Sequence, residues 1–250
     1  NVTPLSIILE PFGRNTAPAI ALGIIQAMNL ENDPLVLVLP ADHSINKLNK
    51  FTAIIRKGME YAENNNIVVF GIPPQYPETG FGYIEAQQPL DKLSIEGSKI
   101  KKFIEKPDKK TAEKLLNNNK YSWNSGIFLM RAKFAFKQFK VFEPKLLSVC
   151  EKCIRESYID LDFLRITKKN FFDCPDIPFD IAIMEKTGSG FVLPLNVEWS
   201  DVGSWDALCK ISKKDENGNT LTGKVLSEKS KNCYLRSENK LLAAVDVEDL

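Results

Sequence analysis

The sequence predicts an α/β layered fold with a largely parallel sheet, because short apolar runs typical of strands alternate with stretches of helical periodicity. From Asn217 onward the pattern changes to short β runs broken by Gly, Asn and Ser, without a helical period. We therefore expect an α/β domain over residues 1–216 and the start of an all-β tail over residues 217–250. A β-helix is one form that such a tail can take.

The predicted strands are apolar runs that end at polar or turn-forming residues. The run LVLVL at 35–39 has no polar alternation, which is typical of a strand buried on both faces. The full set of predicted strands is 6–9, 35–39, 67–72, 99–105, 126–131 and 190–198.

The predicted helices lie between these strands. In the first, at 16–29, Thr16 is a candidate cap and Pro18 lies in the first turn. In the last, at 204–212, Ser204 is a candidate N-cap. The other predicted helices are 51–65, 109–119, 132–142 and 143–156.

Composition excludes several classes of protein. The net charge of +1 gives no overall field for nucleic acid or an anionic membrane, and no apolar stretch approaches the roughly 18–20 residues that span a bilayer. The odd number of cysteines, 5, argues against a disulfide framework and suits a reducing cytoplasm. Cys150 and Cys153 form a CxxC pair, for which a structural role is favoured over redox activity or metal binding, since no second CxxC or nearby His accompanies it.

Polar residues follow four of the predicted strands. Glu10, Asp42 and Asp201 each come after a strand, and Glu105 and Lys106 follow another. Ligands of open parallel sheets bind beyond the carboxyl ends of the strands, so these residues are candidates for one site. Ordinary capping of strand ends remains the alternative for each residue, but the coincidence of four strands favours binding.

Two loops have ligand-binding chemistry. In residues 10–23, Arg14 and Asn15 precede a helix whose exposed amides can bind an anion, and Asn15 can donate to and accept from a nucleobase. In residues 77–85, Gly80 and Gly82 allow close approach of the backbone to a ligand. A capped helix start and a hairpin turn, respectively, are the alternative readings.

The remaining polar candidates suit phosphates and hard cations. Glu105 can accept from sugar hydroxyls and Lys106 can neutralise a phosphate, although a surface ion pair explains the same two residues. Asn124 precedes a predicted strand, and Asp201 lies between two tryptophans, which suggests a carboxylate held by packing. The sequence has no G-x-S-x-G motif, and a single histidine, His43, cannot supply a metal cluster.

Taken together, eight segments resemble the mannose-1-phosphate guanylyltransferases, within the sugar-nucleotide pyrophosphorylases. This resemblance implies a Rossmann-like nucleotidyltransferase domain with a mixed, mostly parallel sheet, followed by the start of a β-helical appendage. The family's G-G-x-G-x-R loop, which holds nucleotide phosphates, is not found, and we expect it upstream of Asn1. The matching segments are EPFGRNTAPAIAL, LPADH, ETGFGYIE, FIEKPD, WNSGIF, IDLDFLRI, FDIAIMEK and WSDVGSWDAL.

The resemblance implies transfer of GMP from GTP to mannose 1-phosphate, giving GDP-mannose and pyrophosphate by Mg²⁺-assisted in-line attack on the α-phosphate. It implies catalytic roles for Asp42, Asp201 and Lys106, with Asp42 and Asp201 as Mg²⁺ ligands. Glu185 can equally be a surface acid of a helix. The implied nucleotide-binding residues are Arg14, Asn15, Thr16 and Ala17, and the implied sugar-phosphate-binding residues are Gly82, Glu105, Lys106, Asn124, Asp180 and Glu185.

Two alternatives stay open. One is a related pyrophosphorylase with another nucleotide or hexose 1-phosphate, and the other is a non-catalytic regulatory protein that binds sugar nucleotides. Retention of both Asp42 and Asp201 argues against the second, because binding alone does not require both carboxylates. We expect GTP and mannose 1-phosphate as partners, no nucleic acid or membrane, and, by resemblance, a homodimer formed through the β tail of a cytoplasmic protein.

Overall fold

A computed structural model describes residues 3–91, 94–116 and 118–250. The chain forms two compact units, the first made of residues 1–40 and 47–197 and the second of residues 41–46 and 198–250. The predicted division between residues 216 and 217 stays a prediction.

The centre of the first unit is a six-stranded mixed sheet with the order β2-β7-β4-β10-β6-β5. The terminal strand β5 also pairs with β7, so part of the sheet closes on itself. Of the described pairings in this sheet, only that of β10 with β4 is parallel. The strands are β2 (Leu35–Val38), β4 (Ile67–Ile72), β5 (Tyr83–Ala86), β6 (Ser98–Ile104), β7 (Tyr121–Arg131) and β10 (Gly190–Pro194).

The prediction of a mostly parallel sheet was therefore wrong, and β7 takes part in three of the five described antiparallel pairings. This 11-residue strand runs antiparallel to three partners, with β5 along its first half and β2 along its second. Gly126, with a φ of 69°, lets the strand change direction between them. The sequence predicted a strand that starts at Gly126, but β7 starts at Tyr121. Asn124 therefore lies inside the strand rather than before it.

The environment of β2 also differs from the prediction. All four residues of β2 are only half-buried, because β2 is an edge strand of the six-stranded sheet. The strands that are buried throughout are β4, near the middle of the sheet, and the short β5. An apolar run without alternation thus predicted the strand correctly but not its burial.

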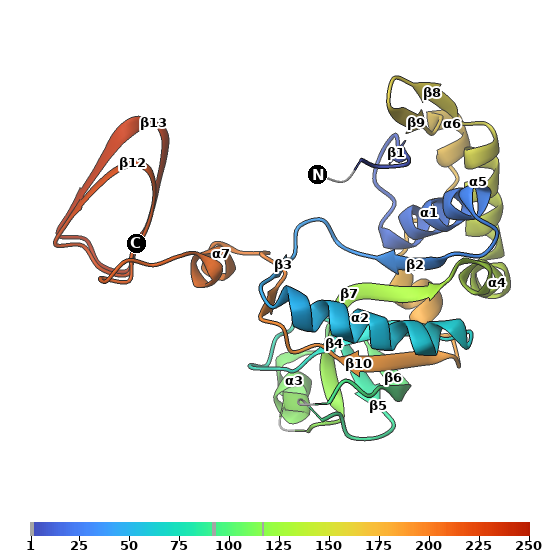
Figure 1. The fold of residues 1–250 in the computed structure, drawn as a ribbon, viewed down its shortest axis with the longest axis horizontal. Coiled ribbons are helices and arrows are strands. Elements are labelled where there is room, and N and C mark those ends of the chain that lie inside the picture. Colours follow the sequence, from blue (N-terminus) through green and yellow to red (C-terminus); the bar gives the residue numbers. More distant parts are fainter. Residues whose placement is uncertain (1–2, 92–93, 117) are drawn as a thin grey trace. The chain divides into compact units, whose positions relative to one another are not determined.

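Helices cover the first unit and fix its loops. Figure 1 shows α2 (Leu48–Glu63) lying along the sheet, where it contacts β7, β4 and β10. The helices α1 (Thr16–Leu30), α4 (Ala132–Phe142) and α5 (Pro144–Arg155) pack against one another. The other helices are α3 (Lys109–Leu116), α6 (Lys168–Phe171) and the π-helical η1 (Asp180–Met184).

The start of α1 differs from the prediction by one residue. The N-cap is Asn15, whose side chain accepts a hydrogen bond from the Thr16 amide at 3.0 Å, so Thr16 is the first helical residue and not the cap. The backbone of Asn15 has a φ of 64°, a conformation that Asn tolerates better than most residues. A second sheet, β1 (Ile7–Leu9), β9 (Phe163–Arg165) and β8 (Tyr158–Asp160), provides the strand that precedes this loop.

The second unit begins with an antiparallel pair, β3 (Ser44–Ile45) and β11 (Trp199–Ser200). The predicted strand 190–198 was too long, since β10 ends at Pro194 and Asp201 follows β11. Ser204 caps α7 (Trp205–Ile211) by accepting from the Ala207 amide at 3.1 Å, which confirms its predicted role.

The last two strands of the second unit are β12 (Thr220–Glu228) and β13 (Tyr234–Val245), which pair in parallel. Figure 1 shows them curving together along the same path. Gly223 has a φ of 84°, and a Cβ there would lie 1.8 Å from the backbone oxygen of Ser237. Glycine is therefore required at this position of the pair.

The five cysteines are free thiols, and Cys150 and Cys153 are buried in α5. This agrees with a structural role for the CxxC pair. In the described part of the chain, no helix is long and apolar enough to cross a bilayer.

Candidate active site

The strands β5, β6 and β7 bring three of the predicted sugar-phosphate residues together. The backbone N–H of Asn124 donates to the backbone oxygen of Gly82 at 2.8 Å. A Cβ on Gly82 would lie 2.9 Å from Oε2 of Glu105, the residue that follows β6. Gly82, Asn124 and Glu105 are thus neighbours, and the absence of a side chain at Gly82 leaves the room that the Glu105 carboxylate occupies.

A hydrogen bond joins Asn124 to η1. Its side-chain amide donates to Oδ1 of Asp180 at 2.8 Å, and its own Oδ1 accepts from the Gly126 amide at 3.0 Å. With the carbonyl engaged by its own strand, the Asn124 side chain holds a fixed orientation toward Asp180. Asp180 begins a π-helix, an element that is frequent at functional sites.

The charges of two other carboxylates, Glu105 and Glu185, act on Asp180. Burial raises the pKa of Asp180 to about 6, and the negative charges of Glu105 and, more weakly, Glu185 push this pKa in the same direction. The hydrogen bonds from its own helical backbone and from Asn124 oppose this shift. The cluster therefore offers several acceptors for hydroxyl groups and one carboxyl that titrates close to neutral pH. Glu185 itself is exposed, at the end of η1.

Lys106 supplies a positive charge at the edge of this cluster. Its ammonium lies 3.6 Å from Oε1 of Glu105, and 64% of its side chain is exposed. Its backbone φ of 42° turns the chain sharply after β6, just before Pro107. An exposed ion pair of this kind stabilises the fold by less than about 1 kcal/mol, so the charge of Lys106 is available to a ligand.

The loop before α1 is attached to the segment that leads into η1. Nη2 of Arg14 donates to the backbone oxygen of Phe172 at 2.8 Å, and the guanidinium lies over the ring of Phe12, 4.9 Å from its centroid. Oγ1 of Thr16 accepts from the Phe179 amide at 2.9 Å. The Ala17 amide donates to the backbone oxygen of Ile177 at 3.2 Å.

These contacts change what each predicted nucleotide residue can do. The Thr16 hydroxyl already accepts from the backbone of Phe179, and Ala17 is buried with its amide bonded to Ile177. Asn15 is exposed and has an amide nitrogen beyond the oxygen that caps α1. Asn15 is therefore better suited to a direct ligand contact than Thr16 or Ala17.

Glu10 is a candidate to which the sequence assigned no particular role. Its Oε1 is buried without a hydrogen-bond partner, and burial raises the pKa of its carboxyl. Nε of Arg14 is likewise buried and unpartnered. Glu10 lines a cavity of about 350 Å³ with Ile8, Phe12, Gly13, Ala19 and Leu22. The sequence signal was its position at the end of a strand, which alone could not separate a ligand contact from capping.

In the second unit, both predicted metal carboxylates act on the same imidazole. Nδ1 of His43 accepts from Nε1 of Trp199 at 3.1 Å, and Oδ1 of Asp42 lies 4.0 Å from Nε2 of His43. Burial lowers the pKa of His43, while the charges of Asp42 and Asp201 partly offset this effect. His43 thus lies against Trp199 of β11 and near Asp42, and Asp42 is exposed to solvent.

The donor set suits a cation that binds few protein ligands. Within residues 3–91, 94–116 and 118–250, no group of three or more His, Cys, Asp or Glu side chains could hold a metal ion. Mg²⁺ needs only one or two carboxylates when a substrate supplies phosphate oxygens, so two aspartates are the kind of ligands that this ion uses, and the binding of one ion by Asp42 and Asp201 stays a prediction. The placement of this pair beside the Arg14 loop and Glu105 stays a prediction.

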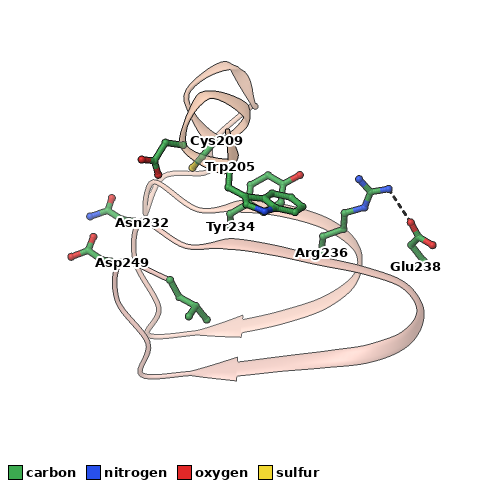
Figure 2. Close-up of a pocket in the computed structure, with 9 residues that line it drawn as sticks. Trp205, Cys209, Asn232, Tyr234, Arg236, Glu238 and Asp249 are labelled. Carbon is green, nitrogen blue, oxygen red and sulfur yellow. Dashed lines mark hydrogen bonds and ion pairs between the residues drawn. The ribbon is translucent and has the colours of Figure 1, made fainter. Parts of the chain in front are cut away.

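Trp205 does not hold Asp201 in the way that the sequence suggested. It is 74% exposed, and its ring contacts Tyr234 with centroids 6.0 Å apart. Figure 2 shows these two aromatic rings in a pocket of about 730 Å³ that contains none of the predicted site residues. Its lining residues are Trp205, Asp206, Cys209, Asn232, Tyr234, Arg236, Glu238, Asp249 and Leu250.

The comparison with known families decides the class of protein. The model of the family described as nucleotidyl transferase matches residues 2–218. The chain belongs to the nucleotidyl transferase family. The clustering of Gly82, Glu105, Asn124 and Asp180 is thus found in a nucleotidyltransferase domain with a mixed α/β fold.

Individual relatives agree with this family. The chain is 45% identical over 245 residues to the mannose-1-phosphate guanylyltransferase of Klebsiella pneumoniae, covering 98% of this chain and 52% of the relative. The chain spans about half the length of the curated relatives that it matches.

Two solved structures resemble this one. A mannose-1-phosphate geranyltransferase from Thermus thermophilus is 27% identical with a TM-score of 0.80, covering 96% of this chain and 68% of that chain. A mannose-6-phosphate isomerase from Helicobacter pylori is 31% identical with a TM-score of 0.69, covering 78% of this chain and 73% of that chain.

Proposed function

We propose that the chain forms the nucleotidyltransferase part of a mannose-1-phosphate guanylyltransferase, which transfers GMP from GTP to mannose 1-phosphate and releases pyrophosphate. The observation that supports this proposal most is the contact network of Gly82, Glu105, Asn124 and Asp180, four residues from separate motifs that neighbour one another. Relatives that share 40–45% identity over 98% of the chain are named for this activity.

On the sugar side, two carboxylates accept hydrogen bonds from the sugar and one lysine binds its phosphate. Glu105 and Asp180 accept from hydroxyl groups of the pyranose, and the Asn124 amide keeps Asp180 oriented. Gly82, which has no side chain, leaves the room in which the Glu105 carboxylate lies. Lys106, exposed beside Glu105, binds the phosphate of the sugar and neutralises part of its charge.

On the nucleotide side, Glu10 and Asn15 read the base. Guanine presents adjacent N–H donors on its Watson–Crick edge, and the unpartnered Oε1 of Glu10 is an acceptor for them. Adenine lacks this pair of donors. Asn15 adds an exposed amide at the N-terminus of α1. Arg14 is held by Phe12 and the backbone oxygen of Phe172, so its guanidinium stays beside Phe12, which lines the same cavity as Glu10.

The transfer needs positioning and charge neutralisation more than a strong base. The attacking phosphate oxygen of mannose 1-phosphate is already ionised at neutral pH, so the protein needs only to align it with the α-phosphorus of GTP. Asp42 and Asp201 would hold Mg²⁺, which when bound supplies Lewis-acid neutralisation of the nucleotide phosphates. Lys106 stabilises the charge on the sugar phosphate.

The second unit is proposed to start a β-helical appendage. The parallel pairing of β12 with β13, with partners such as Thr220 and Tyr234, supports this reading, because successive turns of a β-helix pair in parallel. We further propose that this tail contributes to a homodimer and that the protein acts in the cytoplasm, as its free cysteines suggest.

A thermal-shift panel on the full-length protein tests this proposal against a relative that uses another nucleotide. GTP, ATP, UTP and dTTP are compared, each with Mg²⁺ and with or without mannose 1-phosphate. The proposal predicts the largest rise in melting temperature for GTP, because ligand binding to the native state stabilises it. A larger rise with ATP, UTP or dTTP would favour a different pyrophosphorylase.

A further inference from the structure

Two consecutive residues connect the nucleotide loop to the sugar-phosphate cluster. The backbone N–H of Phe179 donates to Oγ1 of Thr16 at 2.9 Å, on the loop side. The carboxylate of the next residue, Asp180, accepts from the Asn124 side chain at 2.8 Å, on the sugar side. A single peptide unit therefore separates the group that contacts Thr16 from the group that faces the sugar.

The connection is anchored firmly enough to transmit a displacement. Phe179 is fully buried, and its ring lies edge-on to Phe128 and tilted against Phe139, with centroids 4.8 and 5.8 Å away. A second hydrogen bond, from the Ala17 amide to the backbone oxygen of Ile177, attaches the same segment to α1. Because packed interiors deform little, a shift of Thr16 must move Asp180 or break the hydrogen bond to Phe179.

We propose that Thr16 is a positioning residue that couples nucleotide binding to sugar-phosphate binding through the Phe179 amide and Asp180, rather than a residue that contacts the nucleotide. This inference rests on the proposed function, since it names the two ligands whose binding is coupled. The occupied nucleotide loop holds Thr16 in place, Thr16 fixes the start of η1, and Asp180 then presents its carboxylate to the sugar. By linkage, the sugar phosphate tightens nucleotide binding by the same factor.

The chemistry of the side chain sets what a substitution does. Thr16 acts as an acceptor for a backbone N–H, so Ser at this position keeps the contact and Val of the same shape removes it. Thr52 provides a matched control, because its hydroxyl also makes one hydrogen bond, to the backbone oxygen of Leu48 at 2.9 Å, in the exposed part of α2.

The test measures the coupling directly on the full-length protein. Calorimetry gives the Kd of guanosine 5′-[α,β-methylene]triphosphate, which cannot be cleaved at the α-phosphate, with and without mannose 1-phosphate. We expect the sugar phosphate to tighten wild-type binding by at least about 5-fold, a typical coupling. In Thr16→Val this factor falls to below about 2-fold, whereas Thr16→Ser and Thr52→Val keep a factor of at least about 5-fold.

Two results would overturn the proposal. One is a wild type that binds both ligands without coupling, and the other is a Thr16→Val variant that keeps the wild-type factor even if both affinities fall. Amide exchange without ligands adds a second readout: the Phe179 amide should exchange faster in Thr16→Val than in the wild type or Thr16→Ser. An unchanged rate would refute the hydrogen-bond link itself. A wild type that binds neither ligand would refute the proposed function, and it is distinguished from these results by the missing binding signal.

Discussion

At the scale of the residue, the buried carboxyl of Asp180 lowers the stability of the folded protein at neutral pH. Its pKa is raised to about 6 by burial and by Glu105, whereas a solvent-exposed aspartate has a pKa of 3.8. Between these pH values the folded protein retains a proton that the unfolded chain releases. Stability therefore falls as pH rises through this window, and the loss is complete above about pH 6.

Replacing Asp180 by Asn should remove this loss while keeping the hydrogen bond from Asn124. At pH 7.5 we expect Asp180→Asn to raise the unfolding free energy by about 1–3 kcal/mol, since one pKa unit corresponds to about 1.4 kcal/mol. Near pH 4 the variant and the wild type should be equally stable. Urea unfolding at several pH values checks this, with exposed Asp176→Asn as the control. A difference that does not depend on pH would contradict the explanation.

Lys106 is proposed to bind the phosphate of the sugar. Lys106→Ala should raise the KM for mannose 1-phosphate by about 10- to 100-fold, because a hydrogen bond to a charged group contributes about 1.5–3 kcal/mol. The affinity for GTP should change little. Steady-state kinetics on the full-length protein measure both, with exposed Lys102→Ala on β6 as the control. If the two variants behave alike, the charge of Lys106 serves only the surface pair with Glu105.

At the scale of the element, Asn15 caps α1 and is also proposed to contact the nucleotide. Asn15→Ala loses the cap and places Ala at a φ of 64°, so we expect a loss of stability of about 1–2 kcal/mol. Asn15→Gly accepts this backbone conformation and should lose only a few tenths of a kcal/mol. Both variants should bind GTP more weakly, and ATP no more weakly than the wild type does. Urea unfolding and calorimetry separate the two effects, and equal losses for GTP and ATP would show that Asn15 does not read the base.

The parallel pair β12 and β13 depends on Gly223. An added Cβ would clash with backbone rather than with a movable side chain, so Gly223→Ala should destabilise the pair by more than about 2 kcal/mol. Gly188→Ala is the matched control, because a Cβ there meets nothing within 4 Å. Amide exchange over residues 220–245 reports on the pair. Equal protection in the two variants would mean that the strands do not pack as described.

Elements with a clear local signal were predictable. The helix α4 and the strand β4 were both predicted at their observed bounds, because the apolar pattern of each ends where polar or turn-forming residues begin. The start of β7 was missed because Trp123, Asn124, Ser125 and Gly126 look like a turn, while pairing with β5 extends the strand through them. Strand direction was wrong for the same reason: pairing partners far apart in sequence decide it, and local patterns do not contain them.

At the scale of the whole molecule, the candidate site is assembled from segments that no local pattern connects. Residues after β6, within β7 and at the start of η1 become neighbours only through the closure of the sheet by β5 and β7. Their shared role came from resemblance to a family, and their contacts came from the fold. Glu10 was visible as a polar residue at the end of a strand, but its unpartnered buried oxygen could be recognised only in three dimensions.

The proposed formation of GDP-mannose can be tested by direct observation of the phosphorus-containing products. The full-length protein is incubated with Mg²⁺, GTP and mannose 1-phosphate, and ³¹P NMR follows the reaction, with ATP, UTP and glucose 1-phosphate in parallel reactions. We expect the mannose 1-phosphate signal to be replaced by those of a nucleoside diphosphate sugar and pyrophosphate in equal amounts, fastest with GTP. A faster reaction with another nucleotide or with glucose 1-phosphate, or GTP bound without any pyrophosphate formed, would contradict it.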